Sequence, residues 1–365
     1  MSPSLRFPEF TGEWEECVLG DYGKVVTGNT PPTKDIENYE NGTYLWASPA
    51  DLGTHKLISE TKTKLSSKGF TKTRPLSKGS VLVTCIGSTI GKTGMATREM
   101  STNQQINSIV VNENNDNEFV YYVVQSAFPH YLSSIAVQAV PIISKSSFEL
   151  LPSKRPSLQE QNKIGKFLSL LDERISTQHR LIDRLQSLMI GIAQKIAHSN
   201  KPNVRISDCL ECSSSALQES EVNKTGKYPV YGANGIVGYI DKYHTQNEAI
   251  YIIKDGSGVG GVSYVTGKCS STGTLNILQA KNGHSLKYLY YLLKVFNFVP
   301  YKTGMAIPHI YFKDYGKAKI FCPAYPEQLE YAKLLSSIDG NLRIAMDSLK
   351  NFNLQKQYLL RHMLI

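Results

Sequence analysis

The segment CIGSTIGKTG (residues 85–94) ends in Gly-Lys-Thr, the residue types that close a phosphate-binding loop. Such a loop has four residues between its glycines so that successive backbone N–H groups surround the phosphates, whereas three residues separate Gly87 from Gly91. A second copy of the turn, DGSGVGGV (255–262), keeps both glycines but has a glycine in place of the lysine. We therefore interpret the segment as a glycine turn after a strand and predict no nucleotide binding there.

A metal-dependent nuclease is the catalytic alternative. Asp51 followed by Glu60-x-Lys62 resembles the pattern that binds Mg²⁺ through two carboxylates and places a lysine near the attacking water. The spacing is short, and the second half of the chain has no equivalent. NTPPT (29–33) lacks the Asn/Asp-Pro-Pro-aromatic arrangement of adenine methyltransferases, and no Cys/His or Ser/His/Asp arrangement is convincing. We predict no catalytic residues, with a stand-alone nuclease as the less favoured alternative.

Six cysteines are spread along the chain. Only Cys209 and Cys212 have the C-x-x-C spacing of a metal-binding pair, and no second pair lies near enough in the sequence to complete a zinc site. We expect ordinary reduced thiols, and we predict no metal ligands and no cofactor bound by this chain.

The net charge of +9 is unevenly distributed. Residues 55–78 contain seven Lys or Arg and one acidic side chain, and residues 198–324 contain 14 basic and 8 acidic ones. Basic surfaces in both halves favour a polyanionic partner, most simply nucleic acid. A solvated lysine face explains residues 55–78 equally well.

The chain contains no stretch of about 18 apolar residues, so no membrane-spanning helix is expected. Its N-terminus is polar, includes Pro3 and Pro8, and lacks the apolar region of a secretion signal. We expect a cytoplasmic protein that has no contact with membranes.

The sequence contains an internal repeat. A shift of 169 residues aligns Gly87-Ser88 with Gly256-Ser257, and a shift of 167 aligns Glu160-Gln161 with Glu327-Gln328. Because the offset is nearly constant over a long stretch, we interpret the chain as two diverged copies of one unit.

Each copy has the same predicted order of elements. Short apolar runs predict strands at 80–86, 106–111, 249–254 and 274–279. An aromatic helix follows in each copy, at 118–131 and 286–298, and each copy closes with a helix of about 40 residues. The pattern predicts an α+β fold made of two tandemly repeated α/β domains.

The long helices carry apolar side chains at alternating steps of three and four residues, the spacing of a coiled-coil seam. The seam positions are Leu168, Leu171, Ile175, Ile182, Leu185 and Met189 in the first helix and Leu335, Ile338, Leu342, Leu349, Phe352 and Leu359 in the second. Gln178 and Lys356 interrupt the seams, and such polar positions often fix the register. Ser157-x-x-Glu160 predicts a capping box at the start of the first helix.

Each seam needs a surface that covers it. A helix of about 40 residues is roughly 60 Å long, which exceeds what one small domain covers. We therefore predict an antiparallel two-helix coiled coil with a domain at each end and a pseudo-twofold axis between them. The alternative is that each seam packs on its own domain or on another protein. The predicted boundaries are 1–156 for the first domain, 157–198 for the first long helix, 199–324 for the second domain and 325–365 for the second long helix.

The loops of the two copies differ more than the helices do, and they are rich in side chains that form hydrogen bonds. Asn and Gln pair with adenine, and Arg and Lys with guanine, in the major groove, so we predict that these loops bind DNA. The candidates are Trp46, Ser48, Lys92, Thr93, Arg98, Asn103, Gln104 and Gln105 in the first copy and Tyr231, Asn234, Ser257, Lys268, Ser271, Thr272, Lys302, Thr303 and His309 in the second. Alternatively, the loops vary because nothing constrains them.

The layout resembles the specificity subunit of type I restriction-modification enzymes over essentially the whole chain. The resemblance lies in the opening LRFPEFTGEWEE, the G-S-x-x-G turn, and the repeated helix starts PSLQEQNKIGKFLSLLDERI and YPEQLEYAKLLSSIDGNL. The second start departs from the first, with Ala324-Tyr325-Pro326 in place of Pro156-Ser157-Leu158, which leaves the local packing there open.

The resemblance implies two target recognition domains, each reading one half of a bipartite site on double-stranded DNA. It also implies a coiled coil that sets the spacer and docks two methyltransferase subunits, which restriction subunits join. Such a subunit has no catalysis of its own, and S-adenosylmethionine, ATP and magnesium belong to its partners. The alternative from a different class is a non-enzymatic coiled-coil scaffold whose basic loops bind RNA or no nucleic acid.

Overall fold

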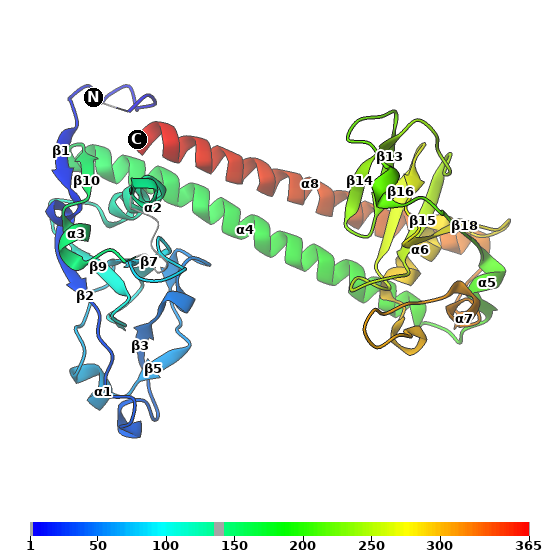
Figure 1. Cartoon of the computed structure of the whole chain (residues 1–365), viewed down its shortest axis with the longest axis horizontal. Helices are drawn as coiled ribbons and strands as arrows, with labels where there is room; N and C mark the ends of the chain where they lie inside the picture. Colours follow the sequence, from blue (N-terminus) through cyan, green and yellow to red (C-terminus); the bar gives the residue numbers. More distant parts are fainter. Residues whose placement is uncertain (1–2, 135–141, 365) are drawn as a thin grey trace. The chain divides into compact units, whose positions relative to one another are not determined.

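The computed structural model describes residues 3–134 and 142–364. Their contacts divide the chain into two compact units (Figure 1): unit 1 comprises Met1–Thr177 and Leu349–Ile365, and unit 2 comprises Gln178–Ser348. Two long helices, α4 (Leu158–Ala197) and α8 (Tyr325–Leu364), contribute residues to both units. The helix bounds lie within one residue of those expected from the sequence, but the units divide each helix instead of ending at it.

Unit 1 is built on a five-stranded sheet in the order β2-β9-β6-β7-β4, in which neighbours are antiparallel except for β4 and β7. A three-stranded sheet, β5-β3-β8, and an antiparallel pair, β1-β10, are the other sheets among the described residues of this unit. The strands are β1 (Glu15–Val18), β2 (Gly23–Thr27), β3 (Tyr44–Ala47), β4 (Leu57–Ile58), β5 (Thr63–Leu65), β6 (Val81–Thr84), β7 (Thr93–Ala96), β8 (Ser101–Thr102), β9 (Ile106–Val111) and β10 (Pro152–Arg155).

Unit 2 repeats this plan with the sheets β12-β18-β15-β16, β14-β13-β17 and β11-β19. The order β12-β18-β15-β16 corresponds to β2-β9-β6-β7 of unit 1, strand for strand. The strands are β11 (Val204–Arg205), β12 (Leu210–Ser214), β13 (Tyr228–Gly232), β14 (Gly235–Ile240), β15 (Glu248–Ile253), β16 (Val262–Thr266), β17 (Ser270–Ser271), β18 (Leu275–Ala280) and β19 (Lys319–Ile320). The four strands expected from apolar runs are confirmed as β6, β9, β15 and β18, and the repeat is visible in the topology.

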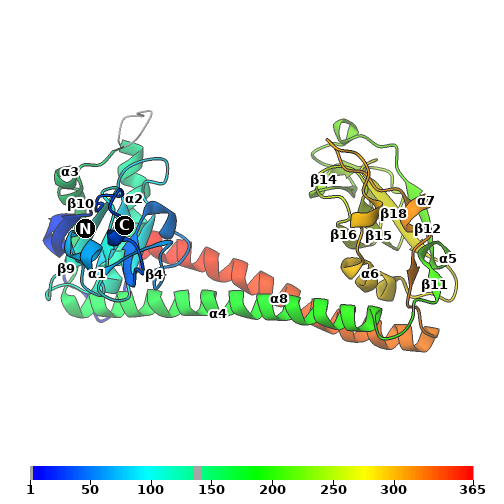
Figure 2. The same ribbon diagram turned by 90° about the horizontal axis from the view of Figure 1, so that it is seen from below.

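The two predicted aromatic helices are α2 (Asn117–Ser134) and α6 (Leu286–Val295). In unit 2, α6 packs on β15 and β16 and lies between this sheet and the long helices (Figure 2). The remaining helices are short: α1 (Ser67–Thr71), α3 (Lys145–Glu149), α5 (Ile206–Cys209) and α7 (Phe312–Tyr315), with 3₁₀ turns at Leu19–Tyr22, Ile36–Asn38, Pro49–Asp51, Glu219–Glu221 and Val299–Tyr301. No helix within residues 3–134 and 142–364 combines the length and hydrophobicity needed to cross a membrane.

In unit 1, the C-terminal part of α8 packs against the N-terminal half of α4 and against α2. Leu168, Leu171 and Leu359 lie in one buried core cluster with the aromatic side chains of α2. The polar interruption of the seam is paired, because Lys356 Nζ lies 2.6 Å from Oδ1 of Asp172. The Tyr122 hydroxyl donates to the other oxygen of Asp172 at 2.6 Å. Burial and the nearby Asp172 carboxylate raise the pKa of Tyr122, so its hydroxyl stays a proton donor.

In unit 2, the seams of α4 and α8 are also turned inward. Ile182 and Met189 of α4 and Leu335, Ile338 and Leu342 of α8 are buried. The second polar interruption, Gln178, donates from Nε2 to the backbone oxygen of Ala345 on the other helix at 2.9 Å. The remaining predicted seam residues, Ile175, Leu185, Leu349 and Phe352, are half-buried.

The glutamine at the start of each long helix ties that helix to the aromatic helix of its unit. Gln161 Oε1 accepts from Asp116 N at 3.1 Å, and its Nε2 donates to Pro156 O at 3.1 Å. Gln328 makes the same two bonds, from Ser285 N at 2.9 Å and to Pro323 O at 2.8 Å. Both glutamines are buried, so each satisfies a main-chain donor and acceptor that water does not reach.

Glu160 has a different role from the capping box expected at this helix start. Its carboxylate is 1% exposed and accepts hydrogen bonds from Arg6 Nε at 2.6 Å and Trp14 Nε1 at 3.3 Å. The carboxylate therefore fixes the N-terminal segment of unit 1 onto α4.

We predict that Gln161→Ala lowers the free energy of unfolding of unit 1 by about 3 kcal/mol, because it leaves a buried N–H and a buried C=O without partners. Both tryptophans of the chain, Trp14 and Trp46, lie in unit 1, so tryptophan fluorescence during urea unfolding reports on this unit alone. The control is Gln159→Ala, an exposed glutamine two residues earlier, which we expect to change stability by less than about 0.5 kcal/mol. Equal changes in the free energy of unfolding for the two variants would contradict the proposed role of Gln161 in joining α4 to α2.

Candidate nucleic-acid interface

Three segments of unit 1 meet in a cluster, and the glycine turn is one of them. Asn103 N donates to Ala47 O at 2.9 Å, which joins the β8–β9 loop to the end of β3. Cys85 N donates to Gln105 O at 2.8 Å, which joins the same loop to the turn between β6 and β7. The unit 1 loop cluster is defined as Trp46–Ser48, Gly87–Lys92 and Asn103–Gln105.

Unit 2 forms the same cluster with the same main-chain hydrogen bonds. Thr272 N donates to Tyr231 O at 2.9 Å, and Lys254 N donates to Thr274 O at 3.0 Å. The two donors stand 169 residues after Asn103 and Cys85, the offset of the sequence repeat. The unit 2 loop cluster is defined as Tyr231–Asn234, Gly256–Gly261 and Thr272–Thr274.

A fourth segment joins the cluster in unit 2. Gly256 N donates to Pro308 O at 3.0 Å, and His309 Nδ1 lies 2.6 Å from Oδ1 of Asp255. Lys302 and Thr303, in the same segment, are exposed. The segment 302–309 therefore brings three of the predicted DNA-binding residues to the cluster.

The glycines of the turn serve backbone geometry in both units. Gly91 and Gly260 have φ of +89° and +91°, a region that side chains with a Cβ rarely adopt. A Cβ at Gly91 would lie 3.0 Å from Cδ1 of Phe128, and one at Gly260 would lie 3.1 Å from Cβ of Phe298. Burial raises the pKa of Cys85, at the start of the first turn, to about 12, so this thiol is no nucleophile at neutral pH. These features support a structural turn.

The predicted contact residues in or next to the clusters differ in exposure. Lys92, Gln104, Asn234 and Ser257 are exposed, and Trp46, Ser48, Gln105, Tyr231 and His309 are half-buried. The others, Thr93, Asn103, Ser271 and Thr272, are at most 8% exposed. Asn103, for example, uses its side chain to accept from Gln105 N at 3.0 Å. These four residues shape the loops from inside, and we remove them from the set of proposed base contacts.

Two predicted residues lie away from the clusters. Arg98 follows β7 and Lys268 lies just after β16, so each stands beyond the strand end opposite the glycine turn. Lys268 Nζ lies 4.8 Å from the ring centroid of Tyr243. Sequence spacing suggested that Arg98 and Lys268 contribute to the loop clusters, but each lies at the opposite end of its strand from the glycine turn.

The basic segment 55–78 is largely neutralised by acidic side chains of its own unit. Lys56, Lys64, Lys68 and Lys72 form ion pairs with Glu118, Glu60, Glu37 and Asp35, respectively. The solvated, internally paired face thus explains most of this segment, and it contributes less to a polyanion-binding surface than its composition suggested.

The nuclease-like pattern does not form a carboxylate pair for metal. Asp51 Oδ1 accepts from Lys62 N at 2.8 Å, and Oδ2 accepts from the Ser48 backbone N at 2.9 Å. Glu60 pairs with Lys64 at 2.6 Å. Asp51 therefore organises the loop that follows β3.

Sequence analysis missed the contribution of the NTPPT segment to the unit 1 cluster. Trp46 Nε1 donates to Asn29 O at 3.1 Å, and the Thr30 hydroxyl donates to Gln104 Oε1. The Asn29 side chain also binds main-chain atoms of Lys72 and Arg74, whose own side chains are exposed. The polar Asn29-Thr30-Pro31-Pro32 turn was the signal for this role in the sequence.

The family model of the type I restriction modification DNA specificity domain matches residues 11–187 and 199–351. The chain belongs to this family. Each matched segment contains one loop cluster and part of one long helix, so the two specificity domains are the two copies detected in the sequence.

The curated relatives are named as type I restriction enzyme specificity subunits. The chain is 27% identical over 186 residues to the type I restriction enzyme MjaIX specificity subunit of Methanocaldococcus jannaschii, which covers 49% of this chain and 43% of the relative. It is 27% identical over 188 residues to the HindI specificity subunit of Haemophilus influenzae, covering 48% and 40%. These matches span less than half the length of either relative.

Solved structures share the fold. The S subunit of a type I restriction-modification system from M. genitalium superimposes with a TM-score of 0.71 at 17% identity, covering 100% of this chain and 99% of that one. A chain from a structure on complex assembly and conformational transition of the type I system superimposes with a TM-score of 0.57 at 15% identity, covering 95% and 96%.

We predict that Gly260→Ala destabilises unit 2 by about 1–3 kcal/mol, because the alanine is forced into a positive φ against Phe298. The control is Gly191→Ala within α4, where a Cβ meets nothing within 4 Å. This change should stabilise the helix by about 1 kcal/mol. Hydrogen exchange of the β15 amides measures both effects, and an unchanged exchange rate in Gly260→Ala would contradict the structural role of the turn.

Proposed function

We propose that the chain is the specificity subunit of a type I restriction-modification complex and that each unit reads one half of a bipartite site on double-stranded DNA. One observation carries the proposal: the two loop clusters share their main-chain hydrogen bonds but present different side chains. A common frame with different exposed groups is what two readers of different half-sites require.

The exposed side chains of the clusters have the chemistry of groove recognition. Gln104 in unit 1 and Asn234 in unit 2 each offer an amide that pairs with adenine. Lys92 and Lys302 offer charge to phosphates, which positions a reader without specifying sequence. We propose these residues as the contact set, with Trp46, Ser48, Gln105, Tyr231, Ser257, Thr303 and His309 around them.

The long helices are proposed to act as a ruler between the half-sites. Both helices are continuous, and each contributes residues to both units. Their seams keep the coiled-coil spacing, and both polar interruptions are matched across the helix pair, Lys356 by Asp172 and Gln178 by the Ala345 carbonyl. An antiparallel coiled coil of this kind fixes the separation of the two readers and hence the spacer.

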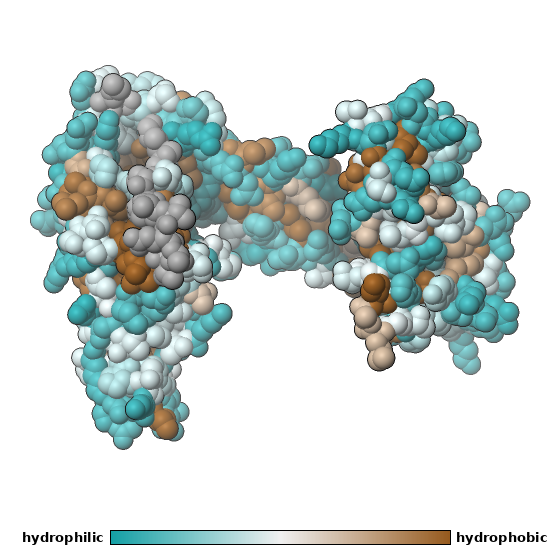
Figure 3. Space-filling model, viewed as in Figure 1, coloured by the Kyte–Doolittle hydropathy of each residue, from teal (hydrophilic) through white to brown (hydrophobic). Residues whose placement is uncertain are grey.

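The outer faces of the long helices are proposed to dock two methyltransferase subunits, through which restriction subunits join. Both helices expose large apolar side chains, which include Leu170, Leu181, Leu188, Ile344, Leu354 and Tyr358. Figure 3 shows hydrophobic surface on the long helices. Side chains of this kind at 43–66% exposure favour a protein partner over solvent. In this proposal the chain supplies specificity without catalysis, and S-adenosylmethionine, ATP and magnesium are bound by the partners.

Gln104→Ala tests the assignment of unit 1 as a reader. In the complex with methyltransferase subunits, we expect about tenfold to a hundredfold weaker binding to the target duplex, as for loss of one bidentate base contact. Base substitutions in one half-site should then matter less, while those in the other keep their effect. The matched control is Arg98→Ala, which removes a positive charge beyond the opposite strand end and should leave affinity nearly unchanged. Fluorescence anisotropy at fixed salt measures both; a wild-type complex without duplex preference would support the scaffold alternative.

Insertion of one seven-residue heptad after Thr177 and another after Ser348 tests the ruler. Seven residues add about 10 Å of helix and keep the seam in register. We expect the methylated motif to retain both half-sites and to gain about three base pairs of spacer, at about 3.4 Å per base pair. Sequencing of adenine methylation in host DNA reads out both quantities, with Gly191→Ala as a variant of unchanged length. Altered half-sites, or an unaltered spacer, would exclude the ruler.

A further inference from the structure

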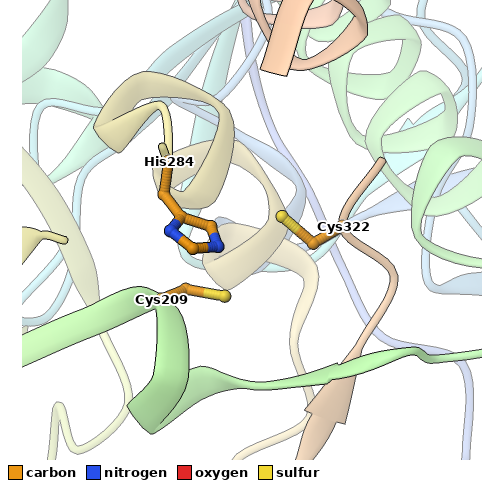
Figure 4. Close-up of side chains that lie close together, drawn as sticks. All are labelled: Cys209, His284 and Cys322. Carbon is orange, nitrogen blue, oxygen red and sulfur yellow. The ribbon is translucent and has the colours of Figure 1, made fainter. Parts of the chain in front are cut away.

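Three metal-binding side chains converge in unit 2 from separate parts of the chain. Cys209 ends α5, His284 immediately precedes the N-cap of α6, and Cys322 lies between β19 and α8. One ligand atom from each residue lies within 4.8 Å of the other two. Figure 4 shows the two thiols and the imidazole turned toward a common point. Within the described residues, no other group of three or more His, Cys, Asp or Glu side chains meets this criterion.

Main-chain hydrogen bonds fix the three positions independently of the thiols and the ring. Lys281 N donates to Cys209 O at 2.9 Å, and His284 N donates to Lys281 O at 3.1 Å. Asn203 holds the third position from both sides, because its Oδ1 accepts from Cys322 N and its Nδ2 donates to Cys322 O, each at 2.8 Å. The ligand set is therefore preorganised by the fold.

The convergence leaves a polar atom unsatisfied. Nδ1 of His284 is buried without a hydrogen-bond partner. Cys209 and Cys322 are 0% and 8% exposed. A buried nitrogen without a partner costs about 1–3 kcal/mol, so no protein group competes for the imidazole ring at this atom.

Unit 1 has the same scaffold without the ligands. Asn112 N donates to Tyr22 O at 3.0 Å and Asn115 N to Asn112 O at 3.1 Å, the counterparts of the bonds made by Lys281 and His284. Tyr22 and Asn115 thus stand where unit 2 has Cys209 and His284, and by the 167-residue offset Arg155 stands where it has Cys322. The buried Tyr22 side chain fills this region and donates to Lys154 O at 2.9 Å. The shared fold therefore does not require sulfur and imidazole at these positions.

We propose that Cys209, His284 and Cys322 bind a zinc ion in unit 2. Zinc prefers thiolate and imidazole ligands in tetrahedral geometry, with ligand bonds of about 2.0–2.3 Å. Small side-chain rotations bring atoms that lie within 4.8 Å of one another to this geometry. Because the group offers three protein ligands, water would supply the fourth.

The bound ion stabilises the segment that leads into the N-terminus of α8. Cys322 lies three residues before Tyr325, the first residue of that helix, and Cys209 directly precedes β12. Coordination joins these two points of unit 2 directly. The sequence spacing pointed to Cys212 as the partner of Cys209, but Cys212 is on β12 and is not in the group. Burial raises the pKa of the Cys212 thiol to about 11, so it remains a neutral thiol.

The test measures metal in the full-length protein. After expression with zinc and purification under reducing conditions, we expect about one zinc per chain by mass spectrometry of the metal. Cys209→Ser, Cys322→Ser and His284→Ala should each reduce the content at least tenfold. Cys212→Ser, three residues from a proposed ligand, is the matched control and should retain zinc at the wild-type level.

Two further measurements separate loss of ligand from loss of fold. His284→Cys keeps a zinc ligand and should retain the ion, whereas His284→Ala should lose it while its circular dichroism spectrum stays that of the wild type. Cobalt substitution should give thiolate charge-transfer absorption in the wild type. Among the Cys-to-Ser variants, only Cys212→Ser should retain this absorption. Wild-type protein without zinc, zinc retained in His284→Ala and Cys322→Ser, or a Cys209–Cys322 disulfide in freshly purified protein would each overturn the proposal.

Discussion

Burial of the long-helix seams is the constraint on which the rest of this structure depends. The aromatic helix α2 rests on the large sheet with one face and needs cover on the other, and that cover comes from α4 and α8. Because the core of unit 1 includes Leu359 and Met363 beside Leu168, the unit is built from sequence segments almost two hundred residues apart. The buried Gln161 and Gln328 then set where each long helix starts relative to the aromatic helix.

The loop clusters depend on this frame without contributing to it. Their main-chain hydrogen bonds are the same in both units, so the positions of the loops do not depend on which side chains are exposed. Residues such as Gln104 and Asn234 therefore change at little cost to stability. In the proposed function, this separation of frame and surface would allow a duplicated unit to acquire two different specificities.

Features that depend on periodicity were predictable from the sequence. Apolar runs gave β6, β9, β15 and β18, and the three-four spacing gave α4 and α8 with their inward faces. Features that depend on three-dimensional contacts were not. Glu160 has the spacing of a cap but binds Arg6, and Thr93 has the chemistry of a DNA contact but is buried. Cys209 has a sequence partner in Cys212, yet the fold brings it to Cys322, over a hundred residues away.

The composition of unit 1 also sets the order in which the chain folds during synthesis. Unit 2 is a continuous segment, Gln178–Ser348, so all its parts are available once that segment has left the ribosome. Unit 1 begins ahead of unit 2 in the sequence but includes Leu349–Ile365, which is made after unit 2. The apolar surfaces of α2 and α4 in unit 1 therefore stay uncovered while unit 2 is synthesised, until α8 packs on them. Unit 1 therefore starts before unit 2 and is completed after it, and in that interval its uncovered apolar surface is open to aggregation.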